Sequence, residues 1–348
     1  MSNPSPSEEH PYMSDFQAFL QKDKQYIKPW LVSWAYQNQR VNRSKSYKEG
    51  LPQDFFYFSG KEDLQEWVNW NLDYPHPDYF PSKENEQLID ISTQNDLNVF
   101  EKLELNVPAD RYREVIGRRN MQDYRFANFY PVPERQKVRR VLDFGSGYGR
   151  QANLWTGARD DVSFLSMDGI PKSYCTQRFY YTNLGPKVFE YMDNPDGYKI
   201  DFQPGIYHFP TWRFDLIPDA SLDLVMCIQV LPELSTRLAK YVLQQFHRAL
   251  KPGGALMLRD GGNWLRTGAG FNLKEHLEST GWSFEFQPHV AHPDDIHGYT
   301  RIWRKTDPAV IKGSAYTRDQ RLFRFAAHLD SLSGGILGKI GRTLFKRS

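Results

Sequence analysis

One short stretch constrains the fold of this chain more than any other. An apolar run ends in an acid, breaks into three alternating glycines and resumes as a helical pattern, in the order Val141-Leu142-Asp143-Phe144-Gly145-Ser146-Gly147-Tyr148-Gly149-Arg150. The pattern predicts a strand, a tight turn and the N-terminus of a helix. Glycines adopt positive φ and let a ligand approach the backbone, and the acid can accept hydrogen bonds from a ribose or an amino group. We therefore interpret the turn as a cofactor site; the alternative is a glycine-rich turn with no ligand.

Length and composition set the outer limits. The 348 residues exceed one typical domain, so we expect a core domain with a substantial additional segment. The 44 basic and 42 acidic residues nearly balance, which gives no global argument for a nucleic-acid or acidic partner. Cys175 and Cys227 have no neighbour at metal-ligand spacing, which indicates buried thiols in a reducing compartment. No signal-peptide pattern and no run of membrane-spanning length is found, so we expect a cytoplasmic protein.

The first third of the chain is expected to be helical. Residues 1–13 are rich in Ser, Pro and Glu and are predicted to be disordered, whereas apolar residues recur at near-helical spacing from Ser14 onward. No alternation of strands and helices occurs in this part of the chain. We therefore interpret residues 14–136 as a mainly helical cap or substrate module.

Aromatic and basic side chains of this module are candidate substrate contacts. Trp67 and Trp70 either stack on flat or sugar rings or belong to the core of the helices. Arg118, Tyr124 and Arg125 lie in the segment that leads into the first strand. They either clamp an anionic substrate or form a solvated or salt-bridged face.

From residue 137 the pattern changes to alternating strands and helices. Strands are predicted at 140–144, 162–167, 221–227, 255–259, 282–286 and 298–304, and helices at 148–156, 171–184, 235–250 and 272–279. Asp168 follows the second strand about twenty residues after the glycine turn, where an acid is placed to bind both hydroxyls of a ribose. Residues 137–306 are therefore predicted to form an α/β domain.

Three separated motifs agree in order and spacing with one protein family. They are the D-x-G-x-G-x-G turn, the acid Asp168, and the pair Asp223-Leu224-Val225 and Leu250-Lys251-Pro252-Gly253-Gly254-Ala255-Leu256. Residues 137–306 thereby resemble the class I S-adenosylmethionine-dependent methyltransferases. The resemblance implies a Rossmann-like seven-stranded sheet whose last strand is antiparallel, and S-adenosyl-L-methionine as the cofactor.

A narrower resemblance comes from the residues around Asp168. The G-x-G-Y-G turn, Asp168-Gly169-Ile170-Pro171 and Gln177-Arg178-Phe179-Tyr180-Tyr181 are similar to segments of bacterial sugar O-methyltransferases, which have one residue fewer before the proline. This implies methyl transfer to a sugar hydroxyl of a bacterial glycan or its precursor. The alternatives are a methyltransferase for another small molecule (aromatic, lipid or secondary metabolite) and a non-catalytic scaffolding protein of the same fold.

The resemblance also implies which residues form the site. The cofactor contacts would be Asp143, Gly145, Ser146, Gly147, Tyr148, Gly149, Asp168, Gly169, Thr211, Trp212 and Gln229. Thr211 and Trp212 stand where the family often has an acid, so a ring-stacking or backbone contact to adenine is expected there. The substrate contacts would be Arg118, Tyr124, Arg125 and Tyr181.

A hydroxyl acceptor must lose its proton, so a general base is expected where the strands end. His292 or His297 is predicted to be that base. Asp260 and Glu233 are rival bases or partners that orient the imidazole, and for each histidine a structural role is the alternative. Although these acids offer hard oxygen ligands, no spacing is diagnostic and no metal is predicted.

The C-terminal tail, residues 307–348, is basic and carries two amphipathic helical patterns. Such helices either contact an anionic membrane surface peripherally, at the inner face of the membrane, or dock on the domain with the basic face in water. Ile228-Gln229-Val230-Leu231 replaces the Asn-Pro-Pro-Tyr type of tetrapeptide, which disfavours a nucleic-acid substrate. The expected partner is a small molecule or glycan.

Overall fold

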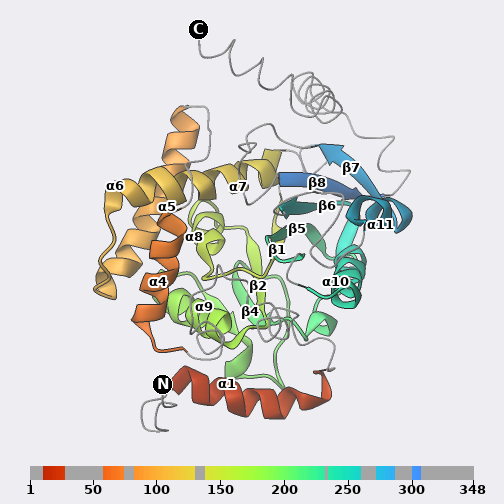
Figure 1. Cartoon of the computed structure of the whole chain (residues 1–348), viewed down its shortest axis with the longest axis horizontal. Coiled ribbons are helices and arrows are strands. Elements are labelled where there is room, and N and C mark those ends of the chain that lie inside the picture. The colour runs from red at the N-terminus through yellow and green to blue at the C-terminus, as the bar shows by residue number, and fades with distance from the viewer. Residues whose placement is uncertain are drawn as a thin grey trace, which may run out of the picture.

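The computed structural model describes residues 11–27, 58–73, 82–129, 138–231, 234–259, 272–286 and 300–306 (Figure 1). Its centre is an eight-stranded sheet with the order β3-β4-β2-β1-β5-β6-β8-β7. The strands are β1 Arg140–Phe144, β2 Ser163–Asp168, β3 Val188–Glu190, β4 Gly205–Pro210, β5 Leu222–Ile228, β6 Leu250–Arg259, β7 Trp282–Phe286 and β8 Thr300–Lys305. The first six are parallel, and β8 runs antiparallel between β6 and β7. The antiparallel last strand is as predicted.

The predicted count of seven strands is wrong. The additional strand is β3, a three-residue edge strand that pairs with β4 through Val188 and Ile206. So short an extended run between a helix and a 3-10 turn carries no periodic signal. In addition, β6 begins at Leu250 rather than Ala255, because Leu250 already pairs with Leu222 and the Lys-Pro-Gly-Gly segment forms an irregularity inside the strand.

The helices that connect the strands follow their local signals. They are α8 Arg150–Gly157, α9 Pro171–Leu184, α10 Thr236–Ala249 and α11 Leu273–Ser279. Proline fits the first turn of α9 because it needs no backbone donor there, and Gly185 ends that helix with a φ of 100°. Ser235 caps α10 by accepting a hydrogen bond from the Leu238 amide.

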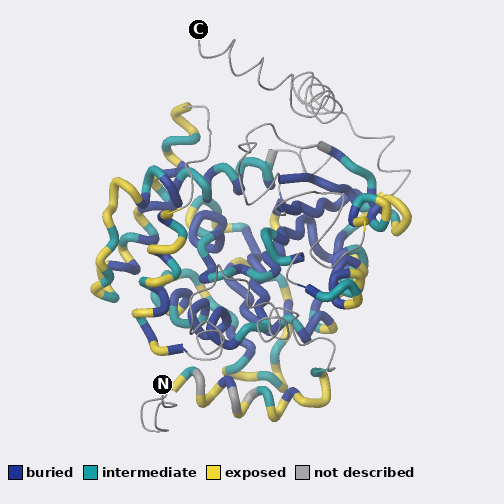
Figure 2. The backbone as a smooth tube through the Cα atoms, in the orientation of Figure 1, coloured by how far each residue is buried: buried dark blue, intermediate teal, exposed yellow. Residues whose placement is uncertain are grey.

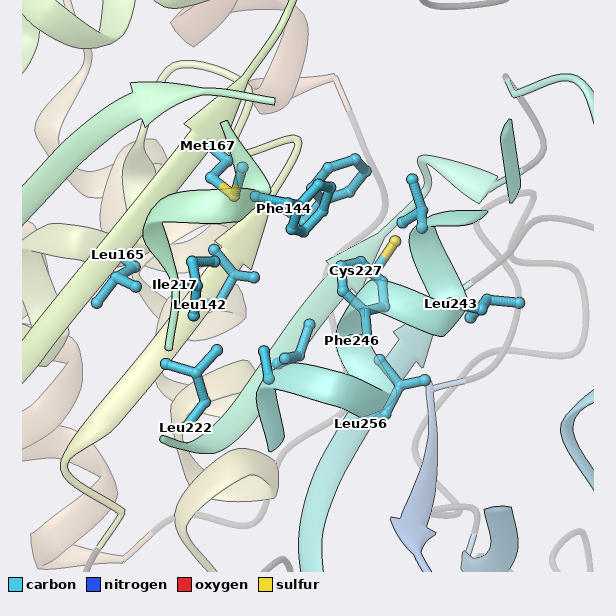
Figure 3. Packing of buried hydrophobic residues seen from close by; sticks show 14 of the residues in the cluster. Leu142, Phe144, Leu165, Met167, Ile217, Leu222, Cys227, Leu243, Phe246 and Leu256 are labelled. Atoms are coloured by element: carbon cyan, nitrogen blue, oxygen red, sulfur yellow. The ribbon is translucent and has the colours of Figure 1, made fainter. Parts of the chain in front are cut away.

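Alternate residues of β1 face the two sides of the sheet. Leu142 and Phe144 lie in one hydrophobic core with α10, where the ring of Phe144 contacts that of Phe246 edge-on at 5.2 Å (Figure 3). Val141 lies in a second core with Leu154 of α8. The period of two is that of a strand buried on both faces.

The described residues before β1 are mainly helical. The elements are α1 Pro11–Lys22, η1 Asp23–Gln25, α4 Lys61–Leu72, α5 Lys83–Lys102, α6 Ala109–Tyr112, the π-helical turn η2 Arg113–Gly117 and α7 Arg118–Phe129. Helix α1 begins at Pro11, three residues before the predicted helical pattern starts at Ser14, so the end of the segment predicted to be disordered is helical.

Helices α4, α5 and α6 lie beside α8 and α9 on the side away from α10, whereas α1 lies apart from these three helices at the bottom of the view in Figure 1. Val68 of α4, Val99 of α5 and Tyr112 of α6 belong to the same core as Val141 and Leu224 of the sheet. The central strands are buried along their length, whereas α1 has an exposed outer side (Figure 2). Helices α4, α5 and α6 are therefore continuous with the core of the α/β domain.

In the described part of the chain, no helix combines the length and the apolar character needed to cross a membrane. The tail, residues 307–348, lies outside the described residues, so its predicted membrane contact stays a prediction.

Candidate cofactor site

The glycine turn lies where β1 ends and α8 begins. Gly145, Gly147 and Gly149 have φ values of 73°, 62° and 94°. A Cβ atom on Gly145 would overlap the side chain of Val230, and one on Gly149 would lie 2.5 Å from the ring of Tyr181. Both the backbone conformation and the space therefore require glycine at these two positions.

The turn presents unused backbone donors. The amide of Gly145 donates to the Met167 carbonyl at 2.8 Å and the amide of Gly149 to the Ser146 carbonyl at 2.9 Å. Within the described residues, the amides of Ser146, Gly147 and Tyr148 have no hydrogen-bond acceptor. Three such amides before the first turn of α8 form a binding position for an anionic group.

Asp143 is the second-to-last residue of β1, just before this turn. Its side chain is buried, and burial raises its pKa to about 7, with the nearby Arg150 guanidinium opposing the shift. The Ser146 hydroxyl donates to the Asp143 carbonyl at 2.9 Å. A cationic group that binds beside Asp143 would favour the ionised carboxylate.

Asp168 ends β2, the strand next to β1. Its Oδ1 accepts the amides of Gly169 at 2.7 Å and Ile170 at 2.9 Å, and its Oδ2 accepts the Gln177 Nε2 at 3.1 Å. Burial raises its pKa to about 6 despite these bonds. Since each carboxylate oxygen accepts two hydrogen bonds, one position on Oδ2 is left for a hydroxyl.

Gln177 on α9 joins Asp168 to the turn. Its Nε2 also donates to the Gly147 carbonyl at 2.7 Å, and its Oε1 accepts from Ser166 at 3.1 Å and lies 3.0 Å from His208 Nε2. The ring of His208 is also bonded to Glu190 at 2.6 Å. Ser166, Glu190 and His208 were not expected at the site from the sequence. Their signal is a polar side chain buried within each of the strands β2, β3 and β4.

Two further predicted cofactor residues, Thr211 and Trp212, follow β4 and have different surroundings. The Thr211 amide donates to the Asp168 carbonyl at 3.1 Å, and its side chain lies beside Gly169. Trp212 turns toward the N-terminal segment, where its indole N–H donates to Asp23 Oδ2 at 2.8 Å and its ring contacts Phe16. The structure thus brings Thr211, but not the indole of Trp212, to the group around Asp168.

Gln229 follows β5 with a φ of 61°, and its amide donates to the Arg259 carbonyl at 2.6 Å. This bond joins the ends of β5 and β6. Arg259 in turn donates to Thr300 Oγ1 at 2.9 Å and pairs with the buried Asp123 of α7, which also pairs with Arg150 at 2.8 Å. The end of β6 is therefore linked to the helix that follows the glycine turn.

The four predicted substrate residues are not gathered at one place. Arg125 pairs with Glu84 at 2.7 Å, and Arg118 pairs with Glu114. The ring of Tyr124 packs edge-on against Trp155 at 4.8 Å. Tyr181 is fully buried below Gly149, with its hydroxyl 2.8 Å from that of Ser166. The ion pairs of Arg118 and Arg125 correspond to the salt-bridged face named as the alternative.

The predicted catalytic residues Glu233, Asp260, His292 and His297 lie outside the described residues. Glu233 directly precedes the described residue Leu234, Asp260 directly follows Arg259 at the end of β6, and β8 begins at Thr300, three residues after His297. Among the residues that the structure does describe, no three His, Cys, Asp or Glu side chains gather in a way that could hold a metal ion.

No protein-family model and no curated protein sequence matches this chain. Solved structures with a similar arrangement exist. They include the following three methyltransferases.

The first is a TehB-like SAM-dependent methyltransferase from Corynebacterium glutamicum, with a TM-score of 0.34 and 15% identity, covering 49% of this chain and 82% of that one. A SAM-dependent methyltransferase from Aquifex aeolicus has a TM-score of 0.37 and 14% identity, over 66% of this chain and 100% of that one. An O-methyltransferase family 2 protein from Planctomyces limnophilus, in complex with apigenin, has a TM-score of 0.38 and 15% identity, over 61% and 62%. Because these TM-scores are below 0.5, the similarity carries no argument about function, which is inferred from the site residues and the sheet.

Proposed function

We propose that this protein is an S-adenosylmethionine-dependent methyltransferase that acts on a sugar hydroxyl of a glycan or its precursor. The observation that carries the proposal is the turn with three unpartnered amides at the end of β1, directly beside the acid that ends β2. In a parallel sheet, ligands bind outside the carboxyl ends of the strands. Both features lie there.

The residues present fit this cofactor. The amides of Ser146, Gly147 and Tyr148 suit its carboxylate, Asp143 suits its ammonium group, and Asp168 Oδ2 suits a ribose hydroxyl. When bound, S-adenosylmethionine supplies an electrophilic methyl group on a sulfonium. The chain orients the acceptor, excludes water and removes the hydroxyl proton, for which His292, His297, Asp260 and Glu233 remain the proposed groups.

A sugar ring is supported as the acceptor by two tryptophans of α4. The ring of Trp67 lies 3.8 Å from the position of a Cβ on Gly147 and contacts Trp70 edge-on at 5.5 Å. Trp70 is 53% exposed, which is unusual for so large an apolar side chain. Indole faces beside the glycine turn suit the apolar face of a sugar, and a small aromatic acceptor is the alternative. The basic tail would bring the enzyme to a lipid-linked substrate at a membrane surface.

The first test is a calorimetric titration of the purified chain with S-adenosylhomocysteine. We expect saturable binding to the wild type and a loss of about tenfold or more in Asp168→Ala, because a hydrogen bond to a charged group is removed. Asp160→Ala is the matched control, since Asp160 is an exposed acid, and it should bind like the wild type. Circular dichroism checks that each variant is folded.

Three results would contradict parts of the proposal. No binding to folded wild type would leave the scaffolding alternative, and unchanged binding in Asp168→Ala would remove Asp168 from the site. If the cofactor binds, transfer of a labelled methyl group to nucleotide sugars and glycans, run beside small aromatic acceptors, tests the substrate. Labelling of the aromatic compounds alone would overturn the sugar assignment.

A further inference from the structure

A buried histidine lies behind the cofactor site without touching it. His208 is at the centre of β4 and is fully buried. Its Nδ1 lies 2.6 Å from Glu190 Oε2, and its Nε2 lies 3.0 Å from Gln177 Oε1. One face of the ring stacks on Tyr174 at 4.0 Å, and Tyr181 contacts the ring edge-on at 5.4 Å.

The partners of Gln177 fix the direction of its amide. Its Nε2 donates to the carbonyl of Gly147 and to the carboxylate of Asp168, which are acceptors at neutral pH. The amide oxygen must therefore be the atom that faces His208, and it too can only accept. His208 Nε2 consequently has to donate a proton to it.

The other ring nitrogen faces a carboxylate. Glu190 is buried, and its Oε1 already accepts the Tyr174 hydroxyl at 2.6 Å and the Met192 amide at 3.0 Å. Its Oε2 is left for His208 Nδ1, which donates because Glu190 is ionised, its pKa being held below the ordinary range. A ring that donates from both nitrogens is an imidazolium.

We propose that His208 is a positioning residue that donates from both ring nitrogens, to Glu190 and to Gln177, and that it locks Gln177 and thereby sets Gly147 and Asp168 for the cofactor. The part that concerns the cofactor rests on the proposed function. A neutral ring with its single proton on Nδ1, bonded to Glu190, would instead turn the Nε2 lone pair toward the Gln177 oxygen. The amide would then rotate, and its donors would leave Gly147 and Asp168.

The surrounding charges agree with a cation at this position. The charged and titratable groups that face His208 are Glu190 from β3, Asp168 from the end of β2, Tyr174 and Tyr181 from α9, and Tyr198 from the segment before β4. Arg178, on the outer turn of α9, acts on Glu190. The His208 cation lowers the pKa of Glu190 below its ordinary range although burial opposes this, and it limits the rise in the pKa of Asp168.

The protonation of His208 can be measured without any cofactor. We would label the full chain with ¹⁵N-histidine and assign His208 as the signal that disappears in the double variant His208→Phe/Glu190→Gln. In the wild type at pH 8 we expect both ring nitrogens to carry protons. In Glu190→Gln, where the glutamine amide can donate to Nδ1, we expect a neutral ring protonated at Nε2. A neutral wild-type ring at pH 8 would overturn the assignment.

The positioning role is tested by binding. Glu190→Gln keeps the Nε2 donor to Gln177, so its affinity for S-adenosylhomocysteine should stay within about threefold of the wild type. His208→Phe/Glu190→Gln removes that donor without stranding a charge, and its affinity should fall about tenfold further. Glu86→Gln, in the ion pair with Arg113 at 2.7 Å, is the matched control and should bind like the wild type.

The outcomes separate the two proposals. Equal affinity of Glu190→Gln and the double variant would overturn the positioning role of His208. If folded wild type binds no S-adenosylhomocysteine, the proposed function fails, while the NMR result still decides whether the buried ring is a cation.

Discussion

Two buried carboxylates are linked to the glycine turn from opposite sides, and their pKa values move in opposite directions. Asp96 of α5 accepts the hydroxyls of Tyr112 and Tyr180, and Tyr112 lies 3.0 Å from the hydroxyl of Tyr148 in the turn. Glu190 reaches the turn through His208 and Gln177. Burial raises the pKa of Asp96 to about 6, whereas the pKa of Glu190 is below its ordinary range.

The difference lies in the donors. Both carboxylates accept tyrosine hydroxyls, but Glu190 is in direct contact with His208 at 2.6 Å, whereas the guanidinium of Arg150 has only a small effect on Asp96. Neutral hydrogen bonds at Asp96 lower its pKa without cancelling the cost of burying a charge. The imidazolium at Glu190 more than cancels it. Asp96 is therefore protonated in the fold below about pH 6, whereas Glu190 stays ionised to a more acidic pH.

The largest expected effect comes from removing the cation. His208→Phe keeps a ring against Tyr174 but leaves Glu190 buried and ionised without its partner. We expect the free energy of unfolding at pH 7.5 to fall by about 3–5 kcal/mol, measured by urea denaturation. Tyr112→Phe removes a neutral donor from Asp96 and should cost only about 1–2 kcal/mol.

The double variant His208→Phe/Glu190→Gln is the control for this first prediction. It removes the stranded charge as well, so much of the lost stability should return. If His208→Phe lowers the free energy of unfolding no more than Tyr112→Phe does, Glu190 is not an ionised group that depends on His208. The two carboxylates then do not differ in the way they are stabilised.

The next largest effect is on the pH dependence of stability. The pKa of Asp96 rises from 3.8 in the unfolded chain to about 6 in the fold, so the folded state binds more protons between these values. Stability from this group is therefore present below pH 3.8 and is lost as the pH rises to about 6, by about 3 kcal/mol in total. Asp96→Asn should remove this slope, and its stability relative to the wild type should rise over the same window.

Glu190 has the opposite sign. Its folded pKa is lowered, so its contribution is present above the unfolded pKa and is lost as the pH falls through the lower folded value. The cost of Glu190→Gln, measured by urea denaturation over the acid range, should therefore shrink toward acid pH. Parallel curves for Asp96→Asn and Glu190→Gln would contradict the comparison.

The parts of this structure that sequence predicts are those with local causes. The alternating glycines, the acid after the second strand, Pro171 at the start of α9 and Gly185 at its end act on neighbouring residues, and the structure has the turn and the helix where they were expected. Strands β1 and β7 have the predicted bounds for the same reason.

What sequence did not predict depends on partners far along the chain. The bond between Asp96 and Tyr180 spans 84 residues, and that between Trp212 and Asp23 spans 189. An aromatic residue after β4 suggests a ring for adenine, but its indole N–H is satisfied by an acid of the N-terminal segment. His208 and Glu190 likewise lie in strands whose apolar patterns do not reveal an ion pair.

The smallest effects on stability are expected for the tyrosine hydroxyls, of which Tyr180 donates to Asp96 and Tyr174 donates to Glu190. Tyr180→Phe and Tyr174→Phe each remove one neutral hydroxyl, and each should lower the free energy of unfolding at pH 7.5 by about 1 kcal/mol. Their pH dependence should differ. Tyr180 stabilises the ionised form of Asp96, so its loss should matter more above pH 6 than at pH 4.5, where Asp96 is protonated in the fold. Glu190 stays ionised beside His208 at both pH values, so the cost of Tyr174→Phe should be constant. A cost of Tyr174→Phe that varies with pH as that of Tyr180→Phe does would mean that Glu190 titrates like Asp96, and that no cation holds it.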